Sequence, residues 1–164
     1  MEIRLRPWSV NDLGLLRRLN TPAMLEHLGG PERGDALLAR LSRYIDAPDG
    51  VFVVERPDTG DAVGFVGWWE REWTGRPVYE TGWSVVPEAQ GLGIARAAAI
   101  EVVRRLRARN EHRELHAFPS VGNAASNAVC RAAGFDLAGE CVVEYPVGSW
   151  MRCNDWVVDL DARG

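Results

Sequence analysis

The chain has 164 residues, a length that fits one domain with a hydrophobic core of its own. Its composition is that of a globular protein, with 46% hydrophobic and 26% charged residues, which argues against a disordered chain. A net charge of -4 makes a nucleic-acid partner a poor candidate, and no apolar run approaches the roughly 20 residues of a membrane span, so we expect no membrane partner either.

The N-terminal part of the chain predicts a strand followed by helices. Residues 3–6 alternate apolar and basic side chains, as a short strand does. Ser9 followed by Asp12 is typical of a helix N-terminus, and leucines follow it up to Leu19. Residues 22–30 read as a second helical piece that stops at two glycines. Three proline and glycine turns then separate the elements that follow, which are a helix at 31–46 and strands at 51–55, 62–73 and 78–86.

After Pro87 the pattern changes from strands to helices alternating with strands. The expected elements are a loop and long helix at 91–109, a strand at 114–118, a helix at 123–133, and strands at 135–145 and 151–160. This order predicts a mixed α/β sheet with helices placed between strands, in a single domain covering residues 1–164.

The three cysteines, Cys130, Cys141 and Cys153, indicate a reducing compartment. Their number is odd and none lies in a Cys-x-x-Cys spacing, so we expect neither a disulfide framework nor a metal site. The first residues show no basic segment followed by an apolar one, as a signal peptide has. We therefore expect a cytoplasmic protein.

One motif joins a strand to a helix through a glycine-rich turn. Residues 85–95 read Val-Val-Pro-Glu-Ala-Gln-Gly-Leu-Gly-Ile-Ala. The glycines let the backbone approach a ligand, and the amides at a helix start favour a pyrophosphate. The motif lacks the Lys-Ser/Thr pair of a P-loop and the third glycine of a dinucleotide-binding fingerprint. An ordinary strand-to-helix turn is the alternative interpretation.

A second motif lies at residues 123–135, where a polar helix start leads to a glycine stop. Taken alone, it could be a capped helix that docks on the sheet. Together, in this order and with a strand between them, the two motifs resemble the GNAT superfamily of N-acetyltransferases. The first matches Gln/Arg-x-x-Gly-x-Gly/Ala at Gln90, Gly93 and Ala95. The second matches Asn-x-x-Ser and Gly-Phe at Asn123, Ser126, Gly134 and Phe135. The likeness is closest to the branch of ribosomal-protein N-terminal acetyltransferases and many small-molecule acetyltransferases.

The resemblance implies an α/β fold with a mixed sheet of about seven strands, splayed between strands four and five and flanked by about four helices. It also implies acetyl-CoA as the acetyl donor. The pantetheine arm of acetyl-CoA would bond to backbone groups of Ser84, Val85 and Val86 and to Asn123 and Asn127. Its pyrophosphate would lie on the turn formed by Gln90, Gly91, Leu92, Gly93, Ile94, Ala95 and Arg96.

The resemblance further implies direct attack of a neutral amine on the thioester, with a carboxylate or histidine as the base. Glu80 and His116 are the candidates, and we favour Glu80, although the sequence does not say which strand face turns to the cleft. Many family members carry a tyrosine, acting as an acid, where this chain has Cys130. Cys130 is either a thiol acid or, as we favour, a packing residue.

The acceptor expected from the resemblance is a small-molecule amine or a protein N-terminus. The missing tyrosine keeps an alternative open, a non-catalytic acyl-CoA-binding module. A homodimer is an open alternative to a monomer.

Overall fold

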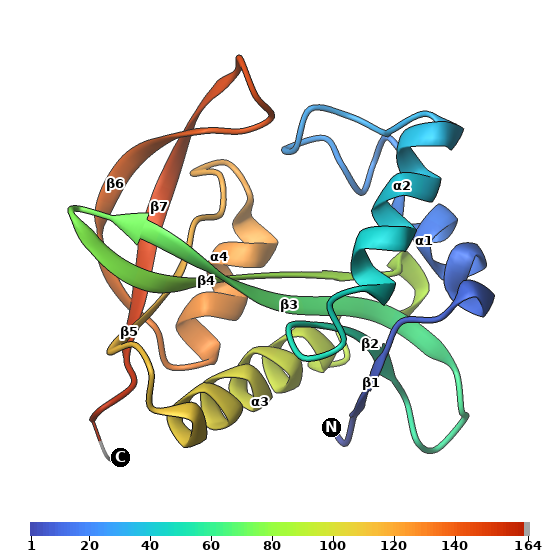
Figure 1. Cartoon of the computed structure of the whole chain (residues 1–164), viewed down its shortest axis with the longest axis horizontal. Helices are drawn as coiled ribbons and strands as arrows, with labels where there is room; N and C mark the ends of the chain where they lie inside the picture. The colour runs from blue at the N-terminus through green and yellow to red at the C-terminus, as the bar shows by residue number, and fades with distance from the viewer. Residues whose placement is uncertain (163–164) are drawn as a thin grey trace. The chain divides into compact units, whose positions relative to one another are not determined.

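The computed structural model describes residues 1–162 and contains one mixed sheet with helices between its strands (Figure 1). The strands lie in the order β1-β2-β3-β4-β5-β7-β6. β4 and β5 are parallel, and the other pairs whose register is described are antiparallel. The predicted mixed α/β sheet is therefore confirmed. The strands are β1 (Arg4–Pro7), β2 (Val51–Glu55), β3 (Ala62–Trp73), β4 (Arg76–Val85), β5 (Glu114–Ala117), β6 (Asp136–Glu144) and β7 (Trp150–Asp159), and the α-helices in the described chain are α1 (Leu13–Leu19), α2 (Gly34–Ile45), α3 (Ile94–Arg109) and α4 (Ala124–Ala132).

The chain divides into two compact units. The first unit consists of Met1–Gly67 and Trp83–Ala98, and the second of Trp68–Gly82 and Ala99–Gly164. β3, β4 and α3 each contribute residues to both units. Each unit has its own set of buried side chains, such as Val53 and Val66 in the first and Leu106 and Leu115 in the second.

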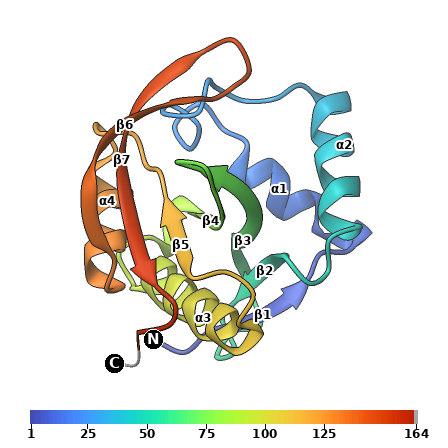
Figure 2. The same ribbon diagram turned by 60° about the vertical axis from the view of Figure 1, so that its left-hand side comes forward.

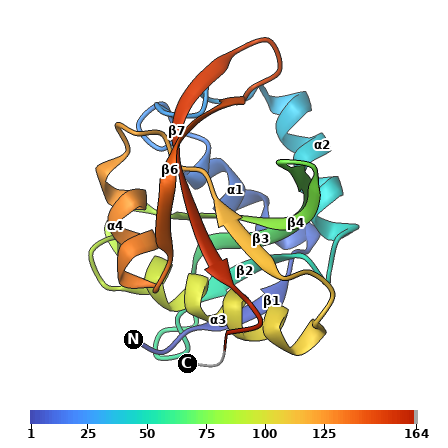
Figure 3. The ribbon, with the colours of Figure 1, turned by 90° about the vertical axis from the view of Figure 1, so that its left-hand side faces the viewer.

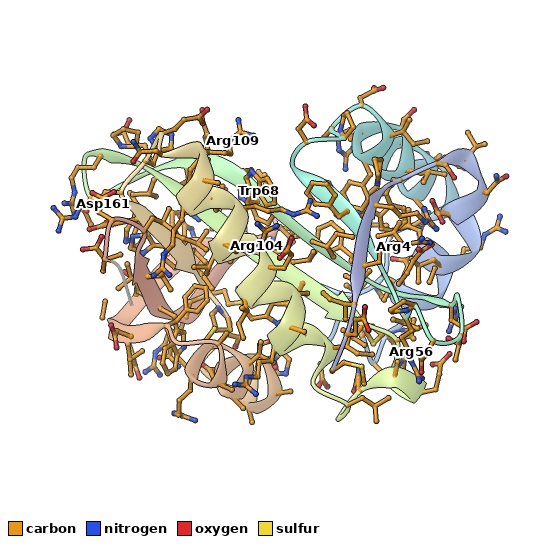
Figure 4. All side chains as sticks on the ribbon, turned by 90° about the horizontal axis from the view of Figure 1, so that it is seen from below. Arg4, Arg56, Trp68, Arg104, Arg109 and Asp161 are labelled. Atoms are coloured by element: carbon orange, nitrogen blue, oxygen red, sulfur yellow. The ribbon has the colours of Figure 1, made fainter. Side chains whose placement is uncertain are left out.

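The first unit starts with an ion-pair cluster that joins β1 to β2. Glu55 is buried and accepts hydrogen bonds from Arg4, labelled in Figure 4, and from Arg6. Arg6 also holds the buried carboxylate of Asp12 at 2.7 and 2.8 Å. Asp12 accepts from the Ser9 backbone at 2.8 Å, while Ser9 Oγ accepts from the Asn11 amide. The predicted capping signal is therefore present, and it places a short 3-10 turn directly before α1.

The predicted helix at 22–30 is wrong, because these residues form consecutive turns. Asn20 bonds both backbone groups of Glu32, at 2.9 and 2.8 Å, and so closes the intervening segment into a loop. Gly29 and Gly30 both have left-handed backbones, with φ of 87° and 85°, which a continuing helix cannot accommodate. The next helix, α2, consequently begins at Gly34, later than the predicted residue 31.

The second unit contains a three-stranded antiparallel arrangement in which β7 lies between β5 and β6 (Figure 2). α4 lies beside β6, as Figure 3 shows. The buried Asn127 of α4 accepts a hydrogen bond from the indole of Trp156 on β7, and the Arg131 guanidinium lies 5.6 Å from the centre of the Trp156 ring. α4 therefore covers the face of β7 that carries Trp156, and the opposite face carries Asp155 and Cys153 because side chains alternate along a strand.

Candidate active site

The glycine-rich turn of the first unit has the backbone that the sequence predicts. Gly91 and Gly93 have φ of 74° and 80°, in the left-handed region that favours glycine. A Cβ added to Gly91 would meet nothing within 4 Å, so its position is open to a ligand. Gln90 donates its side-chain amide to the carbonyl of Val85 at 2.9 Å. This hydrogen bond ties the start of the turn to the end of β4.

α3 begins directly after the turn. The Ala97 amide donates to the Gly93 carbonyl at 3.0 Å, which starts the helical hydrogen-bond pattern. The amides of Ile94 and Ala95 precede that bond and have no intrahelical acceptor, as in any first turn. Residues 91–93 are exposed. The turn can therefore bind an anion through backbone amides and the positive end of the helix dipole.

The end of β4 directs its backbone groups to two different sides. The Val86 amide donates to Val63 of β3 at 2.9 Å, and the Ser84 carbonyl is so close to β3 that a Cβ on Gly64 would lie 2.6 Å from it. Backbone groups alternate along a strand, so those of Val85 point away from β3. Of the three predicted contacts to a pantetheine arm, Val85 thus has the suitable orientation, whereas the Ser84 carbonyl and the Val86 amide face β3.

The two predicted asparagines of α4 have different surroundings. Asn123 is the N-cap, and its side-chain oxygen accepts from the Ser126 amide at 3.1 Å. No residue in the described range 1–162 accepts from its side-chain nitrogen, which leaves both N–H donors of that nitrogen for a ligand. Asn127 is buried, and its amide group already makes four hydrogen bonds, to Ser120, Asn123, Asn154 and Trp156. Asn127 therefore holds α4 to β7 and has no side-chain group left for a cofactor.

Cys130 lies on α4 with no exposed surface. Burial raises the pKa of its thiol to about 12. A thiol in this position is a weak acid without access to solvent, and its surroundings are those of a packing residue.

Glu80 and His116 are register partners in the parallel pair of β4 and β5, so their side chains lie on the same face of the sheet. Glu80 is partly buried. Its Oε2 accepts from the Trp69 indole at 2.9 Å and from Arg71 at 3.0 Å. No residue among 1–162 donates to its other oxygen, Oε1. Two donors on one oxygen fix the carboxylate and leave the second oxygen as the acceptor for a ligand.

His116 is buried between two carboxylates. Its Nδ1 lies 2.6 Å from Asp155 Oδ1 and its Nε2 lies 3.1 Å from Glu114 Oε2. Burial disfavours the charged ring, but the hydrogen bonds to Asp155 and Glu114 outweigh it and raise the pKa of His116 above 6.5. When protonated, the ring donates to both carboxylates. His116 is consequently better suited to hold a proton than to remove one from a substrate.

Further side chains connect these two residues, and the sequence alone does not indicate them. The Arg71 guanidinium lies 4.8 Å from the centre of the Phe118 ring, and Phe118 stacks on His116 at 5.6 Å. Asp155 accepts from the Trp73 indole at 3.0 Å. Strand alternation could have placed Arg71 and Trp73 on one face, but only the pairing of β3 and β7 with their neighbours identifies their contacts. In this group of side chains, the charges of Arg71 and a protonated His116 are thus paired with nearby carboxylates.

The described part of the chain, residues 1–162, holds no group of three or more His, Cys, Asp or Glu side chains arranged to bind a metal ion. Within the same range, every helix is too short or too polar to cross a bilayer.

Comparison with known proteins agrees with the fold. Residues 2–136 match the acetyltransferase (GNAT) domain family. The structure is similar to a GNAT-family acetyltransferase from Bacillus anthracis, with 16% identity, a TM-score of 0.83, and coverage of 99% of this chain and 97% of that one. It is also similar to the Salmonella typhimurium protein yncA, solved with its cofactor acetyl-CoA (22% identity, TM-score 0.74, coverage 100% and 97%).

A third similar structure is a ribosomal-protein-S5-alanine acetyltransferase from Vibrio fischeri (19% identity, TM-score 0.75, coverage 98% and 94%). The comparison with curated protein sequences finds no match.

Proposed function

Because the chain belongs to the GNAT acetyltransferase family, we propose that it transfers the acetyl group of acetyl-CoA to a primary amine. The observation that carries this proposal is the turn at Gln90–Ile94, where two left-handed glycines precede α3 and its first amides have no intrahelical acceptor. A pyrophosphate fits such a turn, because it needs several donors and no nearby side chain. The likeness to yncA, which was solved with acetyl-CoA, supports the same ligand.

We propose that the amine attacks the thioester carbonyl directly. The nitrogen–carbon bond forms, the carbon–sulfur bond breaks, and the coenzyme A thiolate takes up a proton from water. Glu80 is the proposed base, since Arg71 and Trp69 hold one of its oxygens and leave Oε1 for the ammonium group of the acceptor. Cys130 has no part in this scheme, because its thiol is buried.

The proposed acceptor is a small-molecule amine or a protein N-terminus. The name of the Vibrio fischeri protein, a ribosomal-protein-S5-alanine acetyltransferase, supports the second class. The charges around Glu80 neither favour nor oppose a cationic acceptor strongly, because Arg71 and a protonated His116 offset the nearby carboxylates. We also propose that the protein acts in the cytoplasm, where three free thiols remain reduced.

A thiol-release assay tests the proposal. The protein is incubated with acetyl-CoA and, separately, with small amines and with peptides that have free N-termini, and free coenzyme A is followed with a thiol reagent. The expected result is acceptor-dependent release, with N-acetylated product found by mass spectrometry. Tight binding of acetyl-CoA without release for any acceptor would instead favour the non-catalytic acyl-CoA-binding module, which the buried Cys130 in place of a tyrosine keeps open. Absence of acetyl-CoA binding would contradict both.

A further inference from the structure

Two of the three cysteines face each other across a hairpin of the second unit. Cys141 on β6 and Cys153 on β7 are register partners in an antiparallel pair, and both are free thiols. Partners in an antiparallel pair carry their side chains on the same face, so the Cβ atoms of the two cysteines lie close together. Cys130 is on α4 and has no such partner. The pairing of Cys141 with Cys153 is a property of the fold that their spacing in the sequence does not reveal.

The backbone around Cys153 fixes the type of pair. Val121 donates to the Arg152 carbonyl at 3.1 Å, and Asn154 donates to the Pro119 carbonyl at 2.9 Å. The backbone groups of residues 152 and 154 therefore point away from β6, and by alternation those of Cys153 point toward Cys141. Such hydrogen-bonded partners have Cα atoms about 5.5 Å apart. Disulfides span Cα separations of about 4.4–6.8 Å, so this pair is within range without backbone movement.

We propose that Cys141 and Cys153 are a modification site. A small disulfide of the oxidised-glutathione class acts as the oxidant and converts the two thiols into an intrachain disulfide. Cys141 is the thiol that reacts first, because it is partly exposed whereas Cys153 is fully buried. The Cys141 thiolate attacks the oxidant and releases one glutathione thiolate. The Cys153 thiolate then attacks the Cys141 sulfur in the mixed disulfide and releases the second glutathione. Two protein thiols are oxidised and one oxidant molecule is reduced to two thiols.

The chemical surroundings set the rate of this reaction. Burial raises the pKa of the Cys153 thiol to about 11, and burial together with Asp155 raises that of Cys141. The thiolate is the reacting form, so oxidation is slow at neutral pH and accelerates as the pH rises. The two cysteines therefore respond to sustained oxidation and are unsuited to rapid cycles of oxidation and reduction.

The pair lies within the face that carries Glu80 and His116. Cys153 packs in one cluster with Phe118 and Val143, and Cys141 packs against that cluster. The Phe118 ring in turn stacks on His116, and the Arg71 guanidinium lies over the Phe118 ring. A bond between the two sulfur atoms would join β6 to β7 at this cluster, and we expect it to raise the midpoint of thermal unfolding.

Peptide mapping tests the proposal independently of acetyl transfer. The folded protein is incubated with oxidised glutathione at several pH values, then alkylated while unfolded and digested with trypsin. Cleavage after arginine places Cys130, Cys141 and Cys153 on separate peptides, 114–131, 132–152 and 153–163. The expected product links 132–152 to 153–163, with a mass about 2 Da below that of the reduced pair because two hydrogens are lost. Its yield should rise with pH.

Variants make the outcome decisive. Cys130→Ala should leave the linked product unchanged, whereas Cys141→Ala or Cys153→Ala should abolish it. Circular dichroism confirms that each variant is folded. Stable glutathione on Cys141 without the link in the folded wild type would overturn the proposal, and so would links that involve Cys130 in equal yield. A chain that stays fully reduced at all pH values would overturn it as well.

Discussion

Glu80 and His116 lie opposite each other on β4 and β5, yet separate sets of side chains hold their polar atoms. Glu80 is bound through one oxygen by Arg71 and Trp69, whereas both nitrogens of His116 are engaged by Asp155 and Glu114. Only Glu80 therefore has a polar atom left for a substrate. This difference supports the choice of Glu80 as the proposed base, which the sequence alone could not decide.

Replacing Glu80 by glutamine should reduce turnover by about 10²- to 10⁴-fold, the usual contribution of a general base. The change keeps an oxygen for Arg71 and Trp69, so the protein should stay folded, and its affinity for acetyl-CoA should not change. Steady-state kinetics and calorimetry measure the two quantities. If Glu80→Gln keeps full turnover while His116→Ala loses it, the assignment is reversed. If both keep it, the amine loses its proton to bulk water.

The stability contributed by His116 should depend on pH. Its pKa is raised in the folded protein, because the hydrogen bonds to Asp155 and Glu114 outweigh the opposing effect of burial. The protonated ring therefore stabilises the fold fully below the ordinary value of 6.5, and this contribution is lost as the pH rises through the folded pKa. Urea unfolding of wild type and His116→Gln should show a difference in unfolding free energy that shrinks from acidic to alkaline pH. A difference that grows with pH would contradict the protonated state inferred for His116.

Much of the fold could be predicted because its signals are local. The Ser9 and Asp12 cap, the glycine turn before α3 and the alternating strands all depend on neighbouring residues. The loop at 22–30 could not be predicted, because Asn20 closes it through side-chain hydrogen bonds to Glu32. A helix start at residue 22 and a stop at two glycines do not reveal these side-chain hydrogen bonds.

The site was only partly predictable for a related reason. The contact of His116 with Asp155 joins residues 39 positions apart, and it exists only because β7 pairs with β5 in one register. A shift of one residue would turn Asp155 to the other face. The sequence likewise placed Asn127 with the cofactor residues, while its four hydrogen bonds depend on the packing of α4 against β7.

The glycine turn should be the most sensitive part of cofactor binding. Gly93→Glu adds a side chain with negative charge where the pyrophosphate is proposed to lie, and it should abolish measurable binding of acetyl-CoA. Gly60→Glu is the matched control, since Gly60 also has a left-handed backbone, with φ of 77°, in an exposed turn. Both variants should lose roughly 1–2 kcal/mol of stability from backbone strain. Calorimetry should find that only Gly93→Glu loses binding; equal affinity in both folded variants would rule out the proposed anion site.

Asn123 and Asn127 should separate a ligand contact from a structural one. Asn127→Ala leaves the Trp156 indole and the Asn154 side-chain amide without their hydrogen-bond acceptor. The change should lower the unfolding free energy by about 2–4 kcal/mol. Asn123→Ala removes a helix cap and should cost about 1 kcal/mol. It should also weaken acetyl-CoA binding by up to about tenfold, because the free N–H donors of its side-chain amide are lost. Denaturant titration measures the unfolding free energy, and calorimetry measures the affinity for acetyl-CoA. Unchanged affinity in Asn123→Ala would show that Asn123 is a helix cap and not a ligand contact.

The position of β7 between β5 and β6 has a consequence for how the second unit is made. β6 is synthesised before β7, yet β7 supplies its partner in the sheet. Until residues 150–159 have left the ribosome, β6 is an unpaired strand and β5 lacks its antiparallel neighbour. This nascent segment therefore exposes strand edges that can pair with other chains, and a chaperone bound there would protect it until β7 arrives.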